Sequence, residues 1–339
     1  MKPRVAAPRP HAFPECAGAA GALSSQRSST GRISMRLHGV RLISSVLALA
    51  MLSLAGAAHA QGAVQQSATL KRIAASGEVV LSHGAASIPF SFLEPGSTTP
   101  KGYVMDLCQR VVDEIKDVLK RPDLKIRYLA PEKRLDSILQ GKADLECMAT
   151  TNTVERQKTV SFSNHYFVTS SAFGINKAGS VKKLADLNGK RIAVAPGTTN
   201  EKLLVRYQEI KQLKFNLVPM KSTPDGVEML MKGEADAVFS DESAIWGSAN
   251  KNLQRAEVIG YLPEKLSIEP YGIIYRKDDP EFGKLIDGVL DKIIKSGEIN
   301  TLYNRWFVDG QRTPYPMTIY MKDNIRRPSK SGQSYFGLM

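Results

Sequence analysis

Two stretches of this chain follow one pattern, and that repetition constrains the fold more than any other feature. Leu139–Cys147 (LQGKADLEC) is echoed by Met231–Phe239 (MKGEADAVF), so that Gly-x-Ala-Asp recurs after 92 positions. In both copies a helical pattern ends at glycine, a short polar turn follows, and an apolar run of strand length begins. Two such helix–turn–strand units favour an α/β fold with two similar halves, and chance similarity of the two units is the alternative.

Each echoed strand ends in small polar or acidic residues. Ala149–Asn152 (ATTN) follows the first strand, and Ser240–Ser243 (SDES) follows the second. In open α/β sheets, small molecules bind just beyond the carboxyl ends of the strands. We therefore expect two lobes that close on one small molecule.

The first sixty residues do not belong to the predicted fold. A basic start (RLHGVR, residues 36–41) precedes an uncharged apolar run of 13 residues (42–54), and Ala-His-Ala ending at Ala60 is a small-x-small cleavage site. Because a bilayer-spanning helix needs about 20 residues, we expect a cleaved signal peptide and release into the periplasm rather than a membrane anchor. Residues 1–34 lack periodicity, and a natural start at Met35 would explain them.

Charge and composition exclude several classes of function. The net charge of +13 falls to +7 without residues 1–60, because that segment holds seven Lys or Arg and one Glu. The remaining basic residues are spread out and are not interleaved with aromatic residues, which argues against nucleic-acid binding. The three Cys and five His show no metal-ligand spacing, so we expect neither a metal nor a cofactor.

Two cysteines remain in the mature chain, because Cys16 lies in the discarded segment. An even number of cysteines in an oxidising compartment is typical of disulfide bonding. Cys108 falls on a predicted helix, and Cys147 falls on a predicted strand that could pack beneath it. A disulfide and a pair of buried free thiols both remain open.

The mature chain alternates strand and helix patterns, which predicts parallel sheets. We predict strands at 78–83, 125–129, 143–148, 166–175, 191–195, 215–219, 235–240 and 268–275, and helices at 102–119, 135–139, 184–187, 201–213, 224–231 and 280–307. Ile88–Phe92 is predicted to be a loop with exposed aromatic side chains.

The last predicted helix has no sheet of its own unless the chain returns to the first lobe. We therefore expect two crossings between the lobes, near Phe173 and near Glu269, which together form a hinge. The predicted fold class is α/β, with two Rossmann-like lobes joined by two crossing strands. The predicted domains are residues 1–60 (extension and signal peptide), 78–172 with 270–310 (lobe 1), 175–266 (lobe 2) and 311–339 (a docked or loose tail).

Several short motifs mark the mature chain. They are Gly102–Tyr103, Thr150–Lys158 (TTNTVERQK), Pro196–Thr199 (PGTT), Ala235–Val238 (ADAV) and Tyr271–Gly272. Together they resemble family-3 periplasmic solute-binding proteins of ABC transporters for polar amino acids, nearest to the glutamate/aspartate-binding branch. The resemblance runs from about residue 70 to about residue 320, and it implies the periplasmic-binding-protein fold.

The resemblance implies a binding site for a free amino acid, which is a zwitterion. Its α-carboxylate needs a two-pronged cation, and Arg156, just after the Thr150–Thr151 strand end, can supply one. Thr151 and Thr199 can add hydroxyls or amides, and the glycine turn before Thr199 exposes amides at a helix start. The α-ammonium group needs a carboxylate, which Asp241 can supply.

Two neighbouring threonines, Thr150 and Thr198, complete this part of the predicted site. Other roles remain open for several of these residues. Asp241 could cap the following helix, Thr199 or Asn200 could cap the helix around Glu201, and Arg156 could be a solvated surface residue. Phe90 could line the cleft against the carbon chain of the ligand, or it could belong to the core.

The pocket for the ligand side chain departs from the glutamate/aspartate branch. That branch has a His-Arg pair where this chain has His83 followed by Gly84, a His where it has Thr223, and a Ser where it has Pro131. Arg134, a second side-chain-recognising Arg of the branch, is kept. A buried carboxylate with few partners is costly. Glutamate or aspartate is the expected ligand, and a neutral polar or a larger acidic side chain would also fit.

The resemblance thus implies a monomeric periplasmic receptor that delivers an amino acid to a membrane permease and catalyses no reaction. The alternative is a periplasmic enzyme on the same fold, such as a cyclohexadienyl dehydratase, which needs a general acid in the cleft. Glu94, Glu146 and Glu242 are the nearest candidates, and no acid–base pair stands out. The sequence leaves the identity of the amino acid, its affinity and the permease open.

Overall fold

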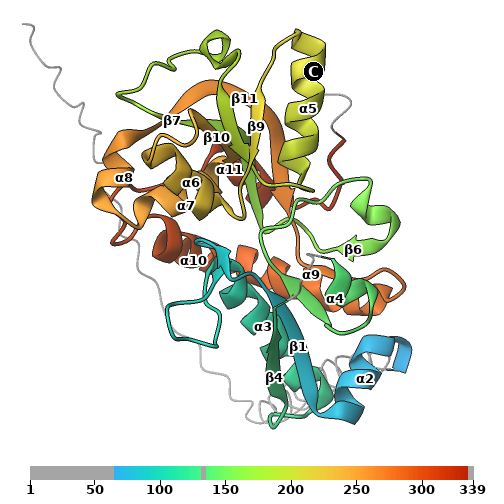
Figure 1. Ribbon diagram of the computed structural model, residues 1–339. Coiled ribbons are helices and arrows are strands. Elements are labelled where there is room, and N and C mark those ends of the chain that lie inside the picture. The colour runs from blue at the N-terminus through green and yellow to red at the C-terminus, as the bar shows by residue number, and fades with distance from the viewer. Residues whose placement is uncertain (1–64, 131–134, 335–339) are drawn as a thin grey trace, which may run out of the picture. The chain divides into compact units, whose positions relative to one another are not determined.

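A computed structural model describes residues 65–130 and 135–334, which fall within one compact unit (Figure 1). The first of two five-stranded sheets contains β1 (Glu78–His83), β4 (Lys125–Leu129), β5 (Leu145–Cys147), β6 (Val160–Phe162) and β12 (Ile274–Arg276). Another, the second sheet, contains β7 (Phe167–Asn176), β8 (Arg191–Val194), β9 (Asn216–Pro219), β10 (Ala237–Asp241) and β11 (Ile259–Tyr271). A short hairpin pairs β2 (Ala86–Ser87) with β3 (Ser91–Phe92).

Each sheet contains one of the two echoed strands near its centre. The order of the first sheet is β4-β1-β5-β12-β6, and the order of the second is β11-β7-β10-β8-β9. β1 is parallel to β4 and β5, and β10 is parallel to β8, as the alternating pattern predicts. Antiparallel strands occur where the chain changes sheet, at β7, β11 and β12. The predicted α/β fold class is confirmed.

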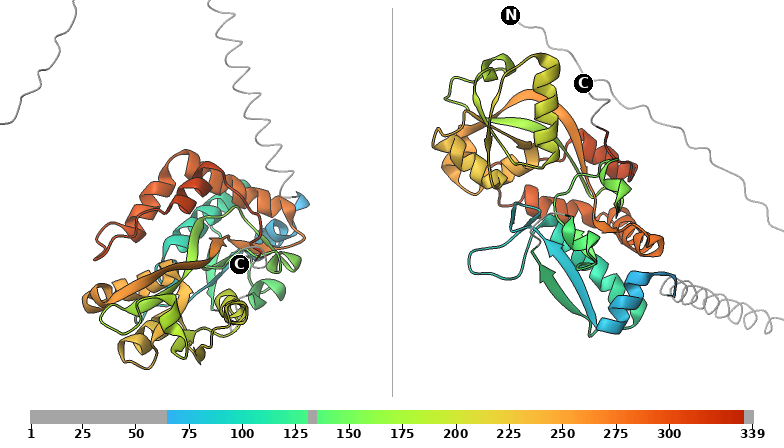
Figure 2. Two further views of the ribbon diagram at one scale, coloured as in Figure 1. Left: turned by 90° about the horizontal axis from the view of Figure 1, so that it is seen from above. Right: turned by 45° about the vertical axis from the view of Figure 1, so that its right-hand side comes forward.

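Helices cover both faces of the first sheet (Figures 1 and 2). They are α2 (Ala68–Ser76), α3 (Tyr103–Leu119), α4 (Asp136–Leu139), α9 (Pro280–Lys295) and α10 (Glu298–Phe307). Alternate residues of β1 face opposite sides, because Val79 and Leu81 join one apolar cluster with α3 and α9 while Val80 joins another beside α4. The single helix predicted for 280–307 is two helices, because Gly297 adopts a left-handed φ of 79° between them.

The second sheet is also covered on both faces. Its helices are α5 (Thr199–Lys211), α6 (Thr223–Met231), α7 (Glu242–Asn250) and α8 (Leu253–Val258). Leu203 and Leu204 of α5 pack with Phe239 of β10 on one face. Val227 of α6 packs with Val238 on the other face, so that neighbouring residues of β10 again serve separate clusters.

The chain passes between the sheets twice, and the two crossing strands pair with each other. β6 leads into β7, and β11 leads into β12, so the sheet changes at residues 163–166 and at 272–273. Phe167–Ser170 pairs antiparallel with Ile268–Tyr271, and β7 joins β10 only from Ser171 onward. The predicted crossing at Glu269 lies in this two-stranded part, whereas Phe173 lies farther inside the second sheet.

The loop with predicted exposed aromatic residues is instead part of the core. Phe90 and Phe92 are 0% and 5% exposed, and the ring of Phe90 lies edge-on to Phe167 with 4.8 Å between ring centroids. The loop packs directly on Gly102, where a Cβ would lie 2.1 Å from the carbonyl oxygen of Phe90. So close an approach of two backbones requires glycine. It also buries the loop around Phe90, which the sequence pattern alone predicts to be exposed.

Helix α7 contacts both halves of the structure. It follows β10 of the second sheet, yet Trp246 packs in the first core, which is the apolar cluster that contains residues of β1, α3 and α9. The ring centroid of Trp246 lies 5.7 Å from that of Phe307 and 5.3 Å from that of Tyr315. The backbone of the same helix lies against the β2–β3 loop, because a Cβ on Gly247 would be 2.4 Å from the carbonyl oxygen of Ile88. The two halves therefore meet here in close van der Waals contact.

The described part of the C-terminal tail is docked rather than loose. Helix α11 (Ile319–Arg326) lies beside β7, and Met321 is 1% exposed within the first core (Figure 1). Asn324 Nδ2 donates to the carbonyl oxygen of His165 at 2.8 Å. The tail therefore contributes to the core that the preceding elements build.

Some predictions lie outside the described residues. They include the signal peptide, its cleavage after Ala60, and the side-chain pocket residues Pro131 and Arg134. Among the helices that the structure does describe, none is both long enough and apolar enough to cross a bilayer. The domain boundaries drawn from the sequence stay predictions.

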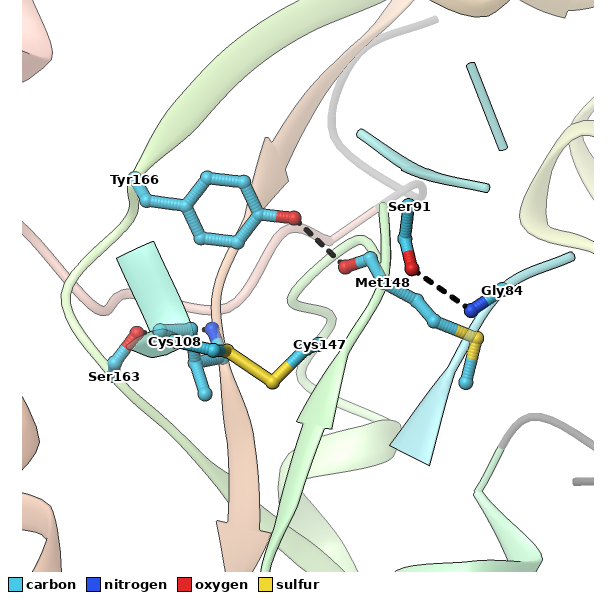
Figure 3. Close-up of a disulfide and its surroundings, with 8 residues drawn as sticks. Gly84, Ser91, Cys108, Cys147, Met148, Ser163 and Tyr166 are labelled. Carbon is cyan, nitrogen blue, oxygen red and sulfur yellow. Dashed lines mark hydrogen bonds between the residues drawn. A yellow bond between two sulfur atoms is a disulfide. The ribbon is translucent and has the colours of Figure 1, made fainter. Parts of the chain in front are cut away.

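Cys108 and Cys147 form a disulfide, the first of the two open alternatives (Figure 3). The bond joins α3 to the last residue of β5, three residues before Thr150. The next residue, Met148, is fixed as well, because its carbonyl oxygen accepts a hydrogen bond of 2.7 Å from the Tyr166 hydroxyl (Figure 3). The covalent link therefore anchors the strand end that carries predicted site residues.

Removing the disulfide with the double substitution Cys108→Ala/Cys147→Ala should destabilise the protein. The two residues are 39 positions apart. A crosslink over this span stabilises the folded state by about 2–4 kcal/mol, because it restricts the unfolded chain. Urea unfolding should therefore show a lower midpoint than that of the oxidised wild type. The wild type in dithiothreitol is the control and should shift similarly, whereas unchanged midpoints in both samples would contradict the expected contribution.

Candidate functional site

The predicted site residues gather around the end of β11. Glu269 and Tyr271 are two positions apart on this strand, so their side chains point to the same face. Both residues are 0% exposed. Glu269 contacts two of the predicted hydroxyls, and Tyr271 contacts the predicted carboxylate.

One oxygen of Glu269 joins hydroxyls from the two halves. Thr151 Oγ1 donates to Glu269 Oε2 at 2.6 Å, and Thr199 Oγ1 donates to the same oxygen at 3.5 Å. Thr151 follows β5 of the first sheet, whereas Thr199 begins α5, which follows β8 of the second sheet. The structure therefore brings these two predicted residues together, as two lobes around one site require.

Sequence reasoning named Glu269 only as a crossing point and missed its place in the site. The available signal was a charged residue inside the otherwise apolar, extended segment LSIEPY. A buried carboxylate is costly without hydrogen-bond donors, so a charged residue in such a segment indicates donors nearby. Besides the two threonines, the Ser267 hydroxyl donates to Glu269 Oε1, and it can accept a hydrogen bond from the Ser171 hydroxyl, whose oxygen lies 2.9 Å away.

Asp241 is held by donors from two elements. Asn200 Nδ2 of α5 donates to Asp241 Oδ1 at 2.8 Å, and the Tyr271 hydroxyl donates to Asp241 Oδ2. Asp241 is the N-cap residue of α7, but its side chain makes no capping hydrogen bond. Burial and the nearby carboxylates of Asp241 and Glu269 raise the pKa of Tyr271 well above its usual value, so its hydroxyl remains a donor.

Arg156 is folded back against the site rather than extended into solvent. It begins a short 3-10 turn, Arg156–Lys158, directly after the site threonines. Its Nη1 donates to the carbonyl oxygen of Thr151 at 2.7 Å, and its backbone N–H donates to Thr153 Oγ1 at 3.1 Å. The side chain is half-buried. This geometry places the guanidinium beside the residue whose hydroxyl contacts Glu269.

Capping of α5 is performed by Thr198, so neither Thr199 nor Asn200 fills that role. Thr198 Oγ1 accepts from the Glu201 N–H at 3.2 Å and donates to the carbonyl oxygen of Ala195 at 2.7 Å. This leaves the Thr199 hydroxyl for Glu269 and the Asn200 amide for Asp241. The predicted site residue Thr198 therefore acts through the helix that carries Thr199.

The Gly197 amide, in the exposed turn before α5, is already hydrogen-bonded within the chain. Gly197 has a left-handed φ of 74°, and its N–H donates to Glu201 Oε2 at 2.7 Å. The carboxylate that satisfies this amide comes from the first turn of the helix itself, where the helix dipole favours a negative charge. An incoming anion would have to displace Glu201 from this position.

Two further predicted site residues are fully buried. Thr150 is 0% exposed, and its Oγ1 donates to Glu146 Oε1 at 2.5 Å. Phe90 occupies the core position that the sequence left open, with ring centroids 5.3 Å from Tyr271 and 4.8 Å from Phe167. It supports the ring whose hydroxyl contacts Asp241.

Two of the positions that depart from the glutamate/aspartate branch lie near the strand ends. The Thr223 hydroxyl is 3.0 Å from Ser240 Oγ, next to Asp241 in the sequence. The Gly84 N–H donates to Ser91 Oγ at 3.0 Å, and Met148 lies beside this pair (Figure 3). A Cβ at Gly84 would lie 3.0 Å from the carbonyl oxygen of Ser91, so a larger residue here would require the Ser91 backbone in β3 to move by a few tenths of an ångström.

Comparison with known families agrees with this fold. The model of the bacterial extracellular solute-binding proteins, family 3, matches residues 79–309. The chain belongs to this family. The match begins in β1 and ends just after α10, so this solute-binding protein carries α11 and the segment after it beyond the matched region.

Individual relatives are similar over most of their length. The chain is 35% identical over 271 residues to the L-glutamate/L-aspartate-binding protein of Pseudomonas aeruginosa, covering 77% of this chain and 88% of that protein. It is 34% identical over 258 residues to the glutamate/aspartate import solute-binding protein of Salmonella typhimurium, covering 75% and 84%. A crystal structure of a mutant of ArgBP from T. maritima matches with a TM-score of 0.60 and 26% identity, covering 70% and 98%.

A buried histidine beside the site should make stability depend on pH. Burial lowers the pKa of His165 to about 4, and its Nε2 lies 3.2 Å from the amide nitrogen of Asn152. A neutral ring can accept this hydrogen bond, whereas a protonated ring would place two donors together. The pKa of this histidine in the unfolded chain is about 6.5, so its full contribution to stability is present above that pH. As the pH falls toward 4, the free energy of unfolding decreases by about 2–3 kcal/mol.

Urea unfolding of the wild type between pH 7.5 and pH 4.5 should follow this slope. The variant His165→Gln retains an acceptor for Asn152 but does not titrate, so its unfolding midpoint should fall less over the same range. Equal slopes for the two proteins would show that His165 does not cause the acid sensitivity.

Proposed function

We propose that this solute-binding protein is the periplasmic receptor of an amino acid ABC importer and delivers a free amino acid to a membrane permease. The observation that carries the proposal is the sharing of Glu269 Oε2 by Thr151 and Thr199, which come from opposite halves. The same cluster contains a guanidinium and a carboxylate, the two groups that a zwitterion requires. The names of the relatives support amino acids as the class of ligand.

In this proposal Arg156 binds the α-carboxylate of the ligand. Its guanidinium presents a planar fork, and each charge-assisted hydrogen bond contributes about 1.5–3 kcal/mol. The bond from Nη1 to the carbonyl oxygen of Thr151 fixes the side chain before the ligand arrives. Because the fork is held in advance, less conformational entropy is lost on binding.

Asp241 binds the α-ammonium group. Asn200 and Tyr271 each donate to one of its oxygens and so fix the plane of the carboxylate. Glu269, also buried, adds a second negative charge behind Thr151 and Thr199. A Thr hydroxyl that donates to Glu269 has lone pairs left, with which it can accept a hydrogen bond from the ammonium group.

The side chain of the ligand is proposed to be acidic, as the names of the two relatives suggest. Arg134 is the cation proposed for its distal carboxylate. Thr223, which contacts Ser240 beside Asp241, offers only a neutral hydroxyl. A cationic group at this position would strengthen the preference for an acidic amino acid. A neutral polar amino acid is therefore the competing ligand.

The geometry favours a receptor over an enzyme of the same fold. Of the candidate general acids, Glu94 pairs with Lys101 at 2.8 Å, and this ion pair holds the pKa of Glu94 below its usual value. Glu242 forms an ion pair with Lys265 at 2.5 Å. A general acid needs a raised pKa instead. Incubation with prephenate or arogenate, followed by assay for an aromatic product, tests the enzyme alternative.

Ligand binding should raise the melting temperature of the mature protein in a panel of the twenty amino acids. A ligand at a hundredfold excess over Kd stabilises the folded state by about 2.7 kcal/mol. L-glutamate or L-aspartate should give the largest shift. Glutamine tests the neutral alternative, because its side chain is nearly the same size as that of glutamate but carries no charge. Absence of a shift with every amino acid would contradict the proposed function.

The substitution Arg156→Ala should abolish this shift. Loss of two charge-assisted hydrogen bonds to the α-carboxylate should raise Kd at least a hundredfold, since each contributes about 1.5–3 kcal/mol. The matched control is Arg206→Ala, because Arg206 is an exposed arginine of α5 that pairs with Glu209. A strong shift retained in Arg156→Ala, or lost equally in the control, would count against the role of Arg156.

A further inference from the structure

The chain continues beyond the family match and returns to the candidate site. After α11, residues 328–334 form an extended segment that we call the C-terminal strap. It runs alongside residues 150–157, the site segment, which carries Thr151 and Arg156. The family match ends at residue 309, so the strap lies beyond the matched region.

The strap pairs with the site segment through the backbone. The Gln333 N–H donates to the carbonyl oxygen of Asn152 at 2.8 Å, and the Val154 N–H donates to the carbonyl oxygen of Gln333 at 3.2 Å. These bonds form a parallel bridge between Thr153 and Gln333. The strap thus adds a short strand along one edge of the site segment.

The opposite edge of the site segment pairs with β11. The Asn152 N–H donates to the carbonyl oxygen of Pro270 at 2.7 Å, and Thr151 forms an antiparallel bridge with Tyr271. The site segment is therefore the middle strand of a small three-stranded arrangement. Loss of the strap would expose one of its edges while the other edge stays paired.

Side chains of the site segment also bind the strap. Asn152 Nδ2 and Gln157 Nε2 donate to the carbonyl oxygen of Lys330 at 3.0 Å and 2.8 Å. Gln157, which follows Arg156 directly, donates to Asn152 Oδ1 at 2.9 Å as well. The strap therefore fixes the residues on both sides of the turn from which the Arg156 side chain extends.

The closeness of the strap depends on one glycine. A Cβ at Gly332 would lie 2.7 Å from the Val154 nitrogen and 2.9 Å from the Thr153 carbonyl carbon, both of which are backbone atoms. Contacts this short force the backbones apart, because neither atom belongs to a flexible side chain. The strap also has an anchor of its own, since Lys330 forms an ion pair with Asp287 of α9.

From these contacts we infer that the C-terminal strap is a positioning element for Arg156, and that amino acid affinity depends on residues 328–334. The inference rests on the proposed function. A turn that is bonded along both edges holds the guanidinium in its binding geometry, whereas a turn bonded along one edge adopts that geometry for only part of the time. The apparent Kd rises by the inverse of the competent fraction.

The substitution Gly332→Ala tests the inference with one added carbon. If displacement of the strap leaves the turn competent a tenth of the time, Kd for the amino acid with the largest thermal shift should rise about tenfold. The control is Gly288→Ala, because Gly288 is an exposed glycine of α9 with nothing within 4 Å of an added Cβ. Isothermal titration of both variants and the wild type gives the three values. Equal affinities in all three proteins would overturn the inference.

Two readouts separate positioning of Arg156 from general destabilisation. Amide hydrogen exchange at Val154 should accelerate in Gly332→Ala without ligand, while exchange in the buried strands of both sheets stays unchanged. In an Arg156→Lys background, the Gly332→Ala effect on Kd should shrink below threefold, because lysine lacks the fork that the turn orients. An undiminished tenfold effect there would show that the strap acts on something other than Arg156.

The proposed function and this inference can fail separately. If the wild type binds no amino acid in the panel, the proposed function is wrong and the affinity claim fails with it. If the wild type binds an amino acid but Gly332→Ala binds it equally well, only the inference about the strap is wrong.

Discussion

The antiparallel pairing of β7 with β11 is the interaction on which both halves of this protein depend. The pair belongs to the second sheet, and its far end continues as a two-stranded ribbon of Phe167–Ser170 and Ile268–Tyr271 that leads to the first sheet. Backbone hydrogen bonds make the connection one paired element rather than two independent linkers. Because Glu269 and Tyr271 extend from this ribbon, any bending of the connection moves the side chains around which the site is built.

The chemistry of the site follows from burying two carboxylates close to this connection. Glu269 and Asp241 are held by hydroxyl and amide donors, so each has the hydrogen bonds that make burial of a charge tolerable. Their orientation is therefore set by the fold before a ligand arrives. Preorganised acceptors of this kind favour a cationic group, while Arg156 beside Thr151 offers the complementary charge. The arrangement suits a molecule that carries both charges.

Local patterns in the sequence predicted the sheets and most of their helices, because strand and helix periodicities are local properties. They also placed Thr151 and Asp241 at strand ends, with Arg156 in the short helical turn that follows Thr151. They did not predict that Phe90 is buried, since its burial depends on a close backbone approach to Gly102, 12 positions later, and on ring contacts with Phe167 and Tyr271. The role of Glu269 likewise depends on hydroxyls from distant segments. Such long-range contacts leave no periodicity in the sequence.

The position of α7 has an optical consequence. The chain contains two tryptophans. Trp306 donates to Asp106 at 2.7 Å within the first half, whereas Trp246 reaches from a second-half helix into the first core, where its indole N–H donates to the carbonyl oxygen of Thr313 at 2.8 Å. Separation of the halves would change the polarity around one indole ring and leave the other as an internal reference. Intrinsic fluorescence of the unlabelled protein would therefore report any separation of the two halves.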